Sequence, residues 1–306
     1  MDTRSSAMKL LSANPIIPCL AGGLPLLLTM VCGCGGWTTR QGTLPILQSV
    51  VQNDLPDRTQ PSNQRKWSPQ FSRLPTFEIS GDRILVRNVR NNRYITEHDF
   101  VVHYEDREYD LEQIKGVDFL VCPFQNAEFL AHTLLSFEFE GDRFLAVSAE
   151  IRTENGEQYS PFLGVANQFE MTYVVADEKD LIRLRTRHRD AEVYLYPTVA
   201  SPQQARELFL DVMKRVNQLA VQPEFYHTVL NNCTTSIVKH VNAISPQRIR
   251  YNYSVLLPGL SAKYAHQLGL LDSSLPFEDL KQRSNVTQLS ERFHDDPDYS
   301  LRIRGR

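Results

Sequence analysis

The sequence has few cysteines and no residues at the spacings typical of metal or nucleotide sites. Only five cysteines occur in 306 residues, and Cys19, Cys32 and Cys34 lie near the N-terminus, leaving Cys122 and Cys233 for the rest. Two cysteines cannot build the disulfide framework of a small secreted scaffold. The eight histidines form no HExxH motif, and neither a GxGxxG loop nor a Walker lysine occurs. We therefore expect no metal ion, nucleotide or other cofactor.

No charge of one sign predominates. The chain carries 33 basic and 36 acidic residues, so its net charge of -3 indicates no nucleic-acid partner. With 42% hydrophobic and 23% charged residues, the composition excludes collagen-like, coiled-coil and wholly disordered chains. One stretch, between Lys9 and Arg40, has no charged residue at all.

This uncharged stretch predicts export from the cytoplasm. Arg4 and Lys9 precede an apolar run over residues 15–34, the order found in secretory signals and N-terminal anchors. The run ends on Val-Cys-Gly-Cys-Gly-Gly, which loosely resembles a bacterial lipoprotein cleavage site with Cys34 as the lipidated residue. We expect residues 1–36 to be a signal, a lipoprotein leader or an uncleaved anchor, with the chain membrane-associated through its N-terminus.

Composition divides the remainder into three parts. Residues 37–73 are rich in Gln, Pro, Ser, Asn and Arg and predict a polar linker with little core of its own. Residues 74–272 contain the regular hydrophobic patterns and predict one folded domain. Residues 273–306 are polar and charged, and we expect them to form a loose C-terminal tail.

Strand patterns come first in the domain and helix patterns follow, which predicts an α+β fold with an antiparallel sheet packed against helices. The expected strands cover 76–79, 84–89, 100–104, 117–121, 131–139, 144–151, 169–175 and 193–196, with hairpins at Gly81-Asp82 and Gly141-Asp142. The expected helices begin at Pro202, near Cys233 and at Ser261, the first after the N-cap residue Ser201.

Cys233 is the first candidate for chemistry. The segment Asn231-Asn232-Cys233-Thr234-Thr235 lies where irregular chain meets a helix, and Asn and Thr are residues that cap helix starts. The positive end of the helix dipole and unpaired N–H groups would stabilise a thiolate there. Alternatively, Cys233 is a small buried apolar residue, or it forms a disulfide with Cys122.

His132 is the second candidate, because a thiol nucleophile needs a base and a third group that orients the base. Strand alternation places His132 and Glu138 on one face of the expected strand 131–139. On the next strand, Ser148 and Glu150 share a face, so either could orient His132. Glu150 could instead form a structural ion pair with Arg152 or Arg143.

The ordered sequence blocks over residues 74–245 resemble the Lnb N-terminal periplasmic domain family. The blocks are 87–90, His132 with 135–137, 148–152, 159–161, 173–178, 184–186, 194–197, 209–211, 223–226 and 231–235. The resemblance implies a bacterial envelope protein with a domain similar to permuted NlpC-type, papain-like thiol enzymes, in which the histidine precedes the cysteine.

For this chain the resemblance implies Cys233 as nucleophile, His132 as base, and Glu150 or, second, Ser148 as the orienting group. Asn232 and Tyr226 would hold the cysteine loop or donate to an oxyanion. The family's named member is a lipoprotein N-acyltransferase that continues into membrane helices, whereas a polar tail follows the domain here.

The implied function is acyl transfer through a thioester, with a lipid or lipoprotein as substrate. Two alternatives remain: a cysteine amidase or esterase acting on peptide or lipid, and a non-catalytic envelope lipoprotein that uses the same fold for binding.

Overall fold

The computed structural model describes residues 60–157 and 168–306, which belong to one unit, Asp57–Arg306. The expected leader over residues 1–36, including Cys34, lies outside the described residues. The strands are β1 (Thr76–Ser80), β2 (Arg83–Arg90), β3 (Arg93–Tyr94), β4 (Phe100–Val101), β5 (Tyr104–Asp110), β6 (Ile114–Phe124), β7 (Ala127–Phe139), β8 (Arg143–Arg152), β9 (Glu170–Ala176) and β10 (Tyr194–Pro197).

Most of the helices follow the sheet along the chain, but α3 and η3 lie between β9 and β10, and two short 3-10 turns come earlier. The α-helices are α3 (Glu178–Arg183), α4 (Pro202–Val221), α5 (Cys233–Ile244), α6 (Tyr253–Leu256), α7 (Ser261–Gln267), α8 (Phe277–Ser284), α9 (Thr287–Arg292) and α10 (Tyr299–Arg302). The 3-10 turns are η1 (Pro69–Phe71), η2 (Leu111–Gln113) and η4 (Pro258–Leu260), and η3 (Leu184–His188) is a π-helical turn.

Eight strands form one sheet in the order β1-β2-β9-β8-β7-β6-β10, with β5 paired to β2. All neighbours run antiparallel except β2 and β9, which pair in parallel through Arg90 and Ala176. The sheet is therefore mixed, and the predicted α+β class is confirmed. Both predicted hairpins are present: β1 joins β2 over Gly81, and β7 joins β8 over Gly141, each glycine having a positive φ that suits a tight turn.

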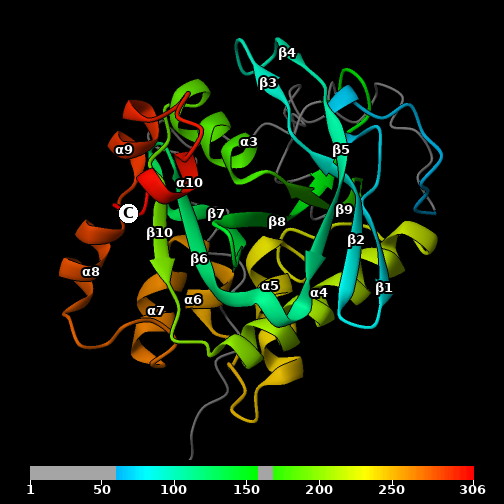
Figure 1. Cartoon of the computed structure of the whole chain (residues 1–306). Helices are drawn as coiled ribbons and strands as arrows, with labels where there is room; N and C mark the ends of the chain where they lie inside the picture. Colours follow the sequence, from blue (N-terminus) through cyan, green and yellow to red (C-terminus); the bar gives the residue numbers. More distant parts are fainter. Residues whose placement is uncertain (1–59, 158–167) are drawn as a thin grey trace, which may run out of the picture. The chain divides into compact units, whose positions relative to one another are not determined.

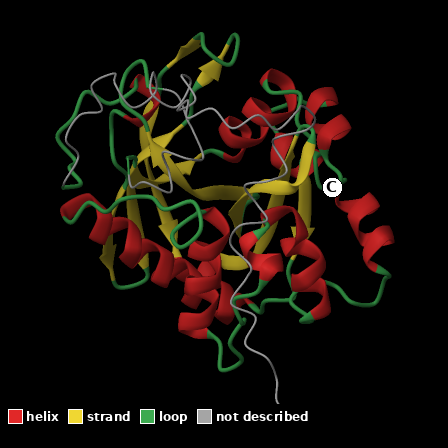
Figure 2. Cartoon of the chain, turned by 180° about the vertical axis from the view of Figure 1, so that it is seen from behind, coloured by secondary structure: helices red, strands yellow, loops and turns green. Residues whose placement is uncertain are grey.

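Helices cover both faces of this sheet (Figure 1, Figure 2). On one face α4 buries the apolar stripe that the sequence predicted, and α5 and α7 pack beside it. Ser201 caps α4 with a reciprocal bond to Gln204, and Pro202 occupies the first turn, so the predicted helix start is confirmed. On the other face, α3 and the C-terminal residues pack against a second cluster around Leu134 and Val174.

The expectation of a loose C-terminal tail is wrong. Tyr299 and Ile303 are 1% exposed and belong to the second core cluster. Between them and the chain end, Arg304 forms buried ion pairs with Asp118 and Glu178 at 2.6 Å. The composition of this segment is polar, but its few apolar residues recur at spacings that let short helices bury them.

The last part of the expected linker also folds. Trp67 stacks against the Arg152 guanidinium at 4.1 Å, and Arg152 donates to the Phe71 carbonyl at 2.9 Å. Phe71 is 8% exposed. A strand over 100–104 was expected, but the structure has the short β4 and then β5, whose highly charged sequence hides its alternation.

Candidate functional site

Cys233 is the first residue of α5, as the sequence predicted. Asn232 is in an extended conformation and caps the helix: its side chain accepts from the Thr235 N–H at 2.8 Å. The Thr235 hydroxyl accepts in return from the Asn232 N–H at 2.8 Å. This capping box fixes the first turn, so Cys233 lies at the positive end of the α5 dipole. Its thiol is 6% exposed.

The first turn of α5 packs against β7 at the residue before His132. Cys233 Sγ lies 4.0 Å from the Ala131 carbonyl oxygen. One residue further along α5 and two further along β7, the hydroxyls of Thr234 and Thr133 lie 3.0 Å apart, and both residues are buried. The structure therefore brings Cys233 to the segment of β7 that carries His132, 101 residues earlier in the chain.

Counted from the turn at Gly141, the pairing of β7 with β8 stops three residues short of His132. Its last pair is Leu135 with Val147, so the strands are no longer hydrogen bonded at the level of His132. Helix α5 contacts both strands, and its first turn meets β7 at Ala131 and Thr133, within the unpaired segment. Strand alternation directs His132 to the face of β7 opposite Ala131 and Thr133, the two residues that meet the first turn of α5.

Side chains replace the backbone bonds across this opening. His132 Nε2 lies 2.6 Å from the Ser148 hydroxyl and 3.6 Å from a Glu150 carboxylate oxygen. Both residues that the sequence placed on the neighbouring strand therefore face the imidazole, and Ser148 is the nearer. Among the described residues, Nδ1 of His132 has no hydrogen-bond partner.

Glu150 pairs with Arg185 of η3, and the expected alternatives Arg152 and Arg143 are wrong. Arg185, 4% exposed, donates to a Glu150 oxygen at 3.2 Å and to the Leu181 carbonyl at 2.7 Å. The pairing is between layers, because the π-helical turn directs Arg185 back onto the sheet. Arg152 instead binds the Phe71 carbonyl, and Arg143 lies over the Tyr109 ring.

These charges set the protonation states of the pair. Burial, with a further contribution from the Arg185 charge, lowers the pKa of His132 to about 3 against the opposing effect of Glu150. Burial alone would raise the pKa of Glu150, but His132 and Arg185 outweigh it and lower that pKa to about 2. At neutral pH the imidazole is therefore neutral and the carboxylate ionised.

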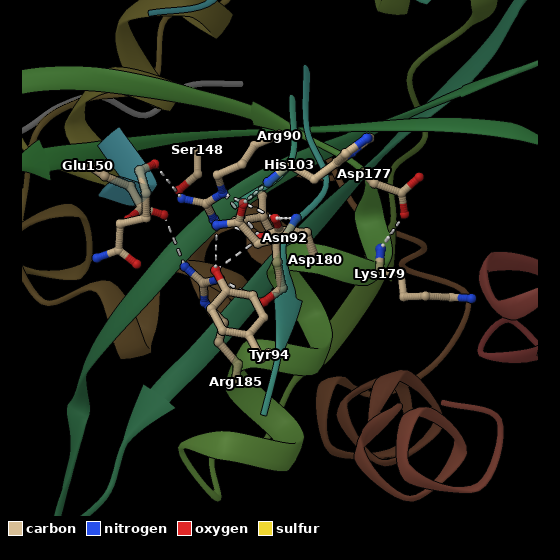
Figure 3. Close-up of polar contacts among 12 residues, drawn as sticks. Arg90, Asn92, Tyr94, His103, Ser148, Glu150, Asp177, Lys179, Asp180 and Arg185 are labelled. Atoms are coloured by element: carbon tan, nitrogen blue, oxygen red, sulfur yellow. Dashed lines mark hydrogen bonds and ion pairs between the residues drawn. The ribbon is translucent and has the colours of Figure 1, made fainter. Parts of the chain in front are cut away.

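A second buried ion pair lies beside the first, and the sequence analysis did not predict it. Arg90 of β2 and Asp180 of α3 are 3% and 2% exposed, and their charged groups are 2.8 Å apart. Asp180 also accepts from the Asn92 N–H at 2.6 Å and from the Tyr94 hydroxyl at 3.5 Å. Figure 3 shows this network next to Arg185 and Glu150. The sequence block 87–90 contains Arg90, but nothing in that block identifies Asp180 as the partner of Arg90.

Asn232 and Tyr226 have different surroundings. Asn232, 4% exposed, donates from its side chain to the Thr228 carbonyl at 2.7 Å, so it ties the cysteine loop to the helix cap. Tyr226 is 8% exposed and packs in the main core, and its N–H donates to the Phe169 carbonyl at 2.8 Å.

Cys122 is the second thiol of the described residues, and both thiols are free. It lies opposite His132 on β6 and is 2% exposed. Burial raises the pKa of the Cys122 thiol to about 11, so this thiol is protonated at neutral pH.

An apolar cavity of about 170 Å³ lies beside the start of α5. Thr234 is part of its wall, and most of the other lining side chains are aliphatic, with Phe119 and Tyr264 as the aromatic members and a few hydroxyl and amide side chains among them. The walls include Val117, Leu135, Leu208, Ile237, Val241 and Ala265. Aromatic residues near His132 do not line it: Phe137 is core, and Phe129 is 52% exposed.

Residues 60–157 and 168–306 contain no group of three His, Cys, Asp or Glu side chains that could hold a metal ion. In the same residues, no helix has both the length and the apolar character needed to cross a bilayer.

Comparison with known proteins gives one match. The profile of the Lnb N-terminal periplasmic domain matches residues 100–259, more than half of the chain, and this range includes His132, Ser148, Glu150 and Cys233. No curated protein and no solved structure matches the chain. The family is named for a periplasmic domain, which indicates an extracytoplasmic location. The chain thus belongs to the Lnb N-terminal periplasmic domain family.

Proposed function

We propose that this protein is an extracytoplasmic thiol enzyme that transfers an acyl group through a thioester on Cys233. The observation that carries the proposal is the placement of the Cys233 thiol, at a capped helix start, 4.0 Å from the residue before His132. A nucleophile, a base and a group orienting the base are the three parts that thiol catalysis requires.

The proposed base is a neutral His132 with its proton on Nε2. In that tautomer Nε2–H donates toward Ser148 and the ionised Glu150, which leaves Nδ1 as the acceptor. Because His132 projects from the other face of β7, the proposal requires the thiol proton to reach Nδ1 through the gap where β7 and β8 are no longer paired. The low pKa of His132 keeps the imidazole neutral at rest. Ser148 and Glu150 together orient the ring and stabilise the imidazolium once it forms.

The proposed reaction has two halves. The Cys233 thiol gives its proton to His132, and the sulfur bonds to the carbonyl carbon of an ester. Backbone N–H groups at the start of α5 stabilise the oxyanion. The carbon–oxygen bond then breaks, the alcohol leaves with the proton from His132, and a thioester remains. An amine attacks the thioester carbon, releasing the sulfur and an amide, while the amine's proton returns to the thiolate through His132.

The apolar cavity favours an acyl substrate over a peptide. It contains few polar groups and begins at Thr234, next to the nucleophile, so a hydrocarbon chain bound there would place its carboxyl end near Cys233. We propose a lipid as acyl donor and a lipoprotein amine as acceptor, with the protein membrane-associated through residues 1–36 or a lipidated Cys34. Release of the acyl group to water would make the same site an esterase or amidase.

The test is to incubate the full chain with diacyl lipid or lipopeptide and measure the mass of the Cys233 peptide. We expect an acyl adduct that is absent in Cys233→Ser and His132→Ala. Iodoacetamide labelling is the companion measurement: Cys233 should react much faster than Cys122 in the folded protein. If both thiols stay inert until unfolding, the protein is a non-catalytic binding module.

A further inference from the structure

A second cluster of titratable groups, two of them buried and one half-buried, lies apart from Cys233 and His132. Asp211 of α4, His240 of α5 and Tyr173 of β9 form one chain of hydrogen bonds. Asp211 Oδ2 lies 2.7 Å from His240 Nδ1, and the Tyr173 hydroxyl lies 2.6 Å from His240 Nε2. Both His240 and Tyr173 are 5% exposed.

Ser236 adds a polar group with no partner. It lies one turn before His240 on α5 and is 2% exposed. Its hydroxyl lies beside Tyr173, with which it interacts weakly, and it has no hydrogen bond of normal geometry within the described residues. A buried hydroxyl without a partner destabilises a fold, and a ligand that accepts from it would remove that cost.

These groups form the floor of a cavity of about 190 Å³ whose rim is positively charged. Lys214 and Arg215 of α4 and Lys239 of α5 line it. Glu224 neutralises Arg215 at 2.6 Å, whereas Lys239 has only the neutral Asn231 amide at 3.0 Å. Among the described residues no partner is found for the Lys214 ammonium group. Two cations on the rim are therefore without an acidic partner.

We propose that this cavity binds a tetrahedral oxyanion of the phosphate class, held by Lys214 and Lys239 on the rim and by the Ser236 and Tyr173 hydroxyls on the floor. Positive charge, hydroxyl donors and small volume all match such an anion and mismatch an apolar or cationic ligand. The site needs no thiol chemistry, so it does not depend on the function proposed above.

The hydrogen-bond chain couples anion binding to proton uptake. When the Nδ1–H of neutral His240 is donated to Asp211, Nε2 accepts a hydrogen bond from the Tyr173 hydroxyl. Tyr173 can donate to an anion only when His240 carries a proton on both nitrogens. The charges around His240 are Asp211, Arg215, Lys239 and Glu224. Burial, opposed by Asp211, lowers the pKa of His240, so the resting imidazole is neutral at pH 7. Anion affinity should therefore rise as pH falls.

The experiment titrates the full chain with sulfate, which stays a dianion over the pH range used, and with inorganic phosphate. Saturable binding, measured by calorimetry, should weaken about tenfold in Lys214→Met/Lys239→Met. The matched control is Lys115→Met/Lys263→Met, which removes the same charge from exposed positions elsewhere and should bind like the wild type. Equal binding by both double variants, or no saturable binding of sulfate, phosphate or phosphatidylglycerol vesicles by the wild type, would overturn the proposal.

Two single variants separate a binding role from a structural one. Ser236→Ala should weaken sulfate binding several-fold without lowering the thermal midpoint of the unliganded protein, because the hydroxyl has no partner to lose. In His240→Gln the increase of sulfate affinity at low pH should disappear. If Ser236→Ala lowers the midpoint and leaves binding unchanged, the cluster is structural.

A binding experiment with lipid vesicles identifies the source of the anion. Binding to phosphatidylglycerol vesicles but not phosphatidylcholine vesicles, lost in Lys214→Met/Lys239→Met and absent with free sulfate, assigns the site to a phospholipid headgroup. Binding of free sulfate and phosphate in the absence of vesicles assigns it to a soluble anion.

Discussion

The Ser148 hydroxyl lies 2.6 Å from His132 Nε2, closer than any carboxylate. A serine on the neighbouring strand therefore makes the most direct contact to the proposed base, and Glu150 lies behind it at 3.6 Å. We predict that Ser148→Ala slows iodoacetamide labelling of Cys233 about tenfold, because the imidazole loses its nearest hydrogen bond. Labelling rates over a pH series provide the measurement.

The matched variant is Glu150→Gln, which keeps the shape but removes the charge. If Glu150 is the main orienting group, Glu150→Gln will slow labelling more than Ser148→Ala does. If both variants are labelled at the wild-type rate, neither residue takes part in activating Cys233.

Stability should fall below neutral pH because of His132. The unfolded chain binds a proton at His132 with a pKa near 6.5, whereas the folded protein resists it down to about 3. More protons are thus bound in the unfolded state as pH falls through 6.5, which lowers the free energy of unfolding. Between pH 7 and pH 5 the loss assigned to this residue is about 2 kcal/mol.

Urea denaturation of wild type and His132→Asn at pH 7 and pH 5 measures this difference. The variant should show a smaller decrease between the two pH values. An identical decrease in both proteins would mean that His132 titrates normally in the fold.

Arg304 should be essential for stability although only two residues follow it in the sequence. Its guanidinium forms ion pairs with the Asp118 and Glu178 carboxylates, which lie away from solvent. Arg304→Met would leave two buried carboxylates without their cation, and we predict a loss of about 3–5 kcal/mol in the free energy of unfolding. The control is Arg306→Met. The Arg306 side chain is exposed where it pairs with Glu138, so we expect the free energy of unfolding to change by less than about 1 kcal/mol. Equal effects would show that the C-terminal residues are not part of the core.

The apolar cavity can be filled without altering the thiol. Val241→Phe adds a ring to its wall on α5, two turns from Cys233. We predict that acyl-adduct formation with a diacyl lipid falls at least about tenfold, while labelling by the small reagent iodoacetamide stays at the wild-type rate. A parallel decrease in both reactions would indicate a disturbed fold, and an unchanged adduct would place the acyl chain elsewhere.

Local patterns predicted the elements that carry their own signals. The stripe from Ala205 to Leu219 and the cap at Ser201 defined α4, and the segment around Asn232 defined the start of α5. Alternation along β7 and β8 put His132, Ser148 and Glu150 on facing positions. These features depend on residues near each other in sequence, where helix and strand periods are sufficient.

Most of the features that the sequence did not predict depend on contacts between residues that are far apart in the chain. The C-terminal segment was expected to be loose because its composition is polar, and β5 was missed because its charged residues mask the alternation. Arg185 was not identified as the partner of Glu150, and no sequence signal joined Arg90 to Asp180.

By itself the sequence determined the α+β class, the capped cysteine, the strand histidine and the family to which the chain belongs. Only the tertiary structure decided that the β7–β8 ladder opens at His132, that α5 begins at this opening, and that arginines from other elements supply the charges behind it. The physical reason is that burial makes a charge depend on its nearest partner in space, and those partners lie tens to hundreds of residues apart along the chain.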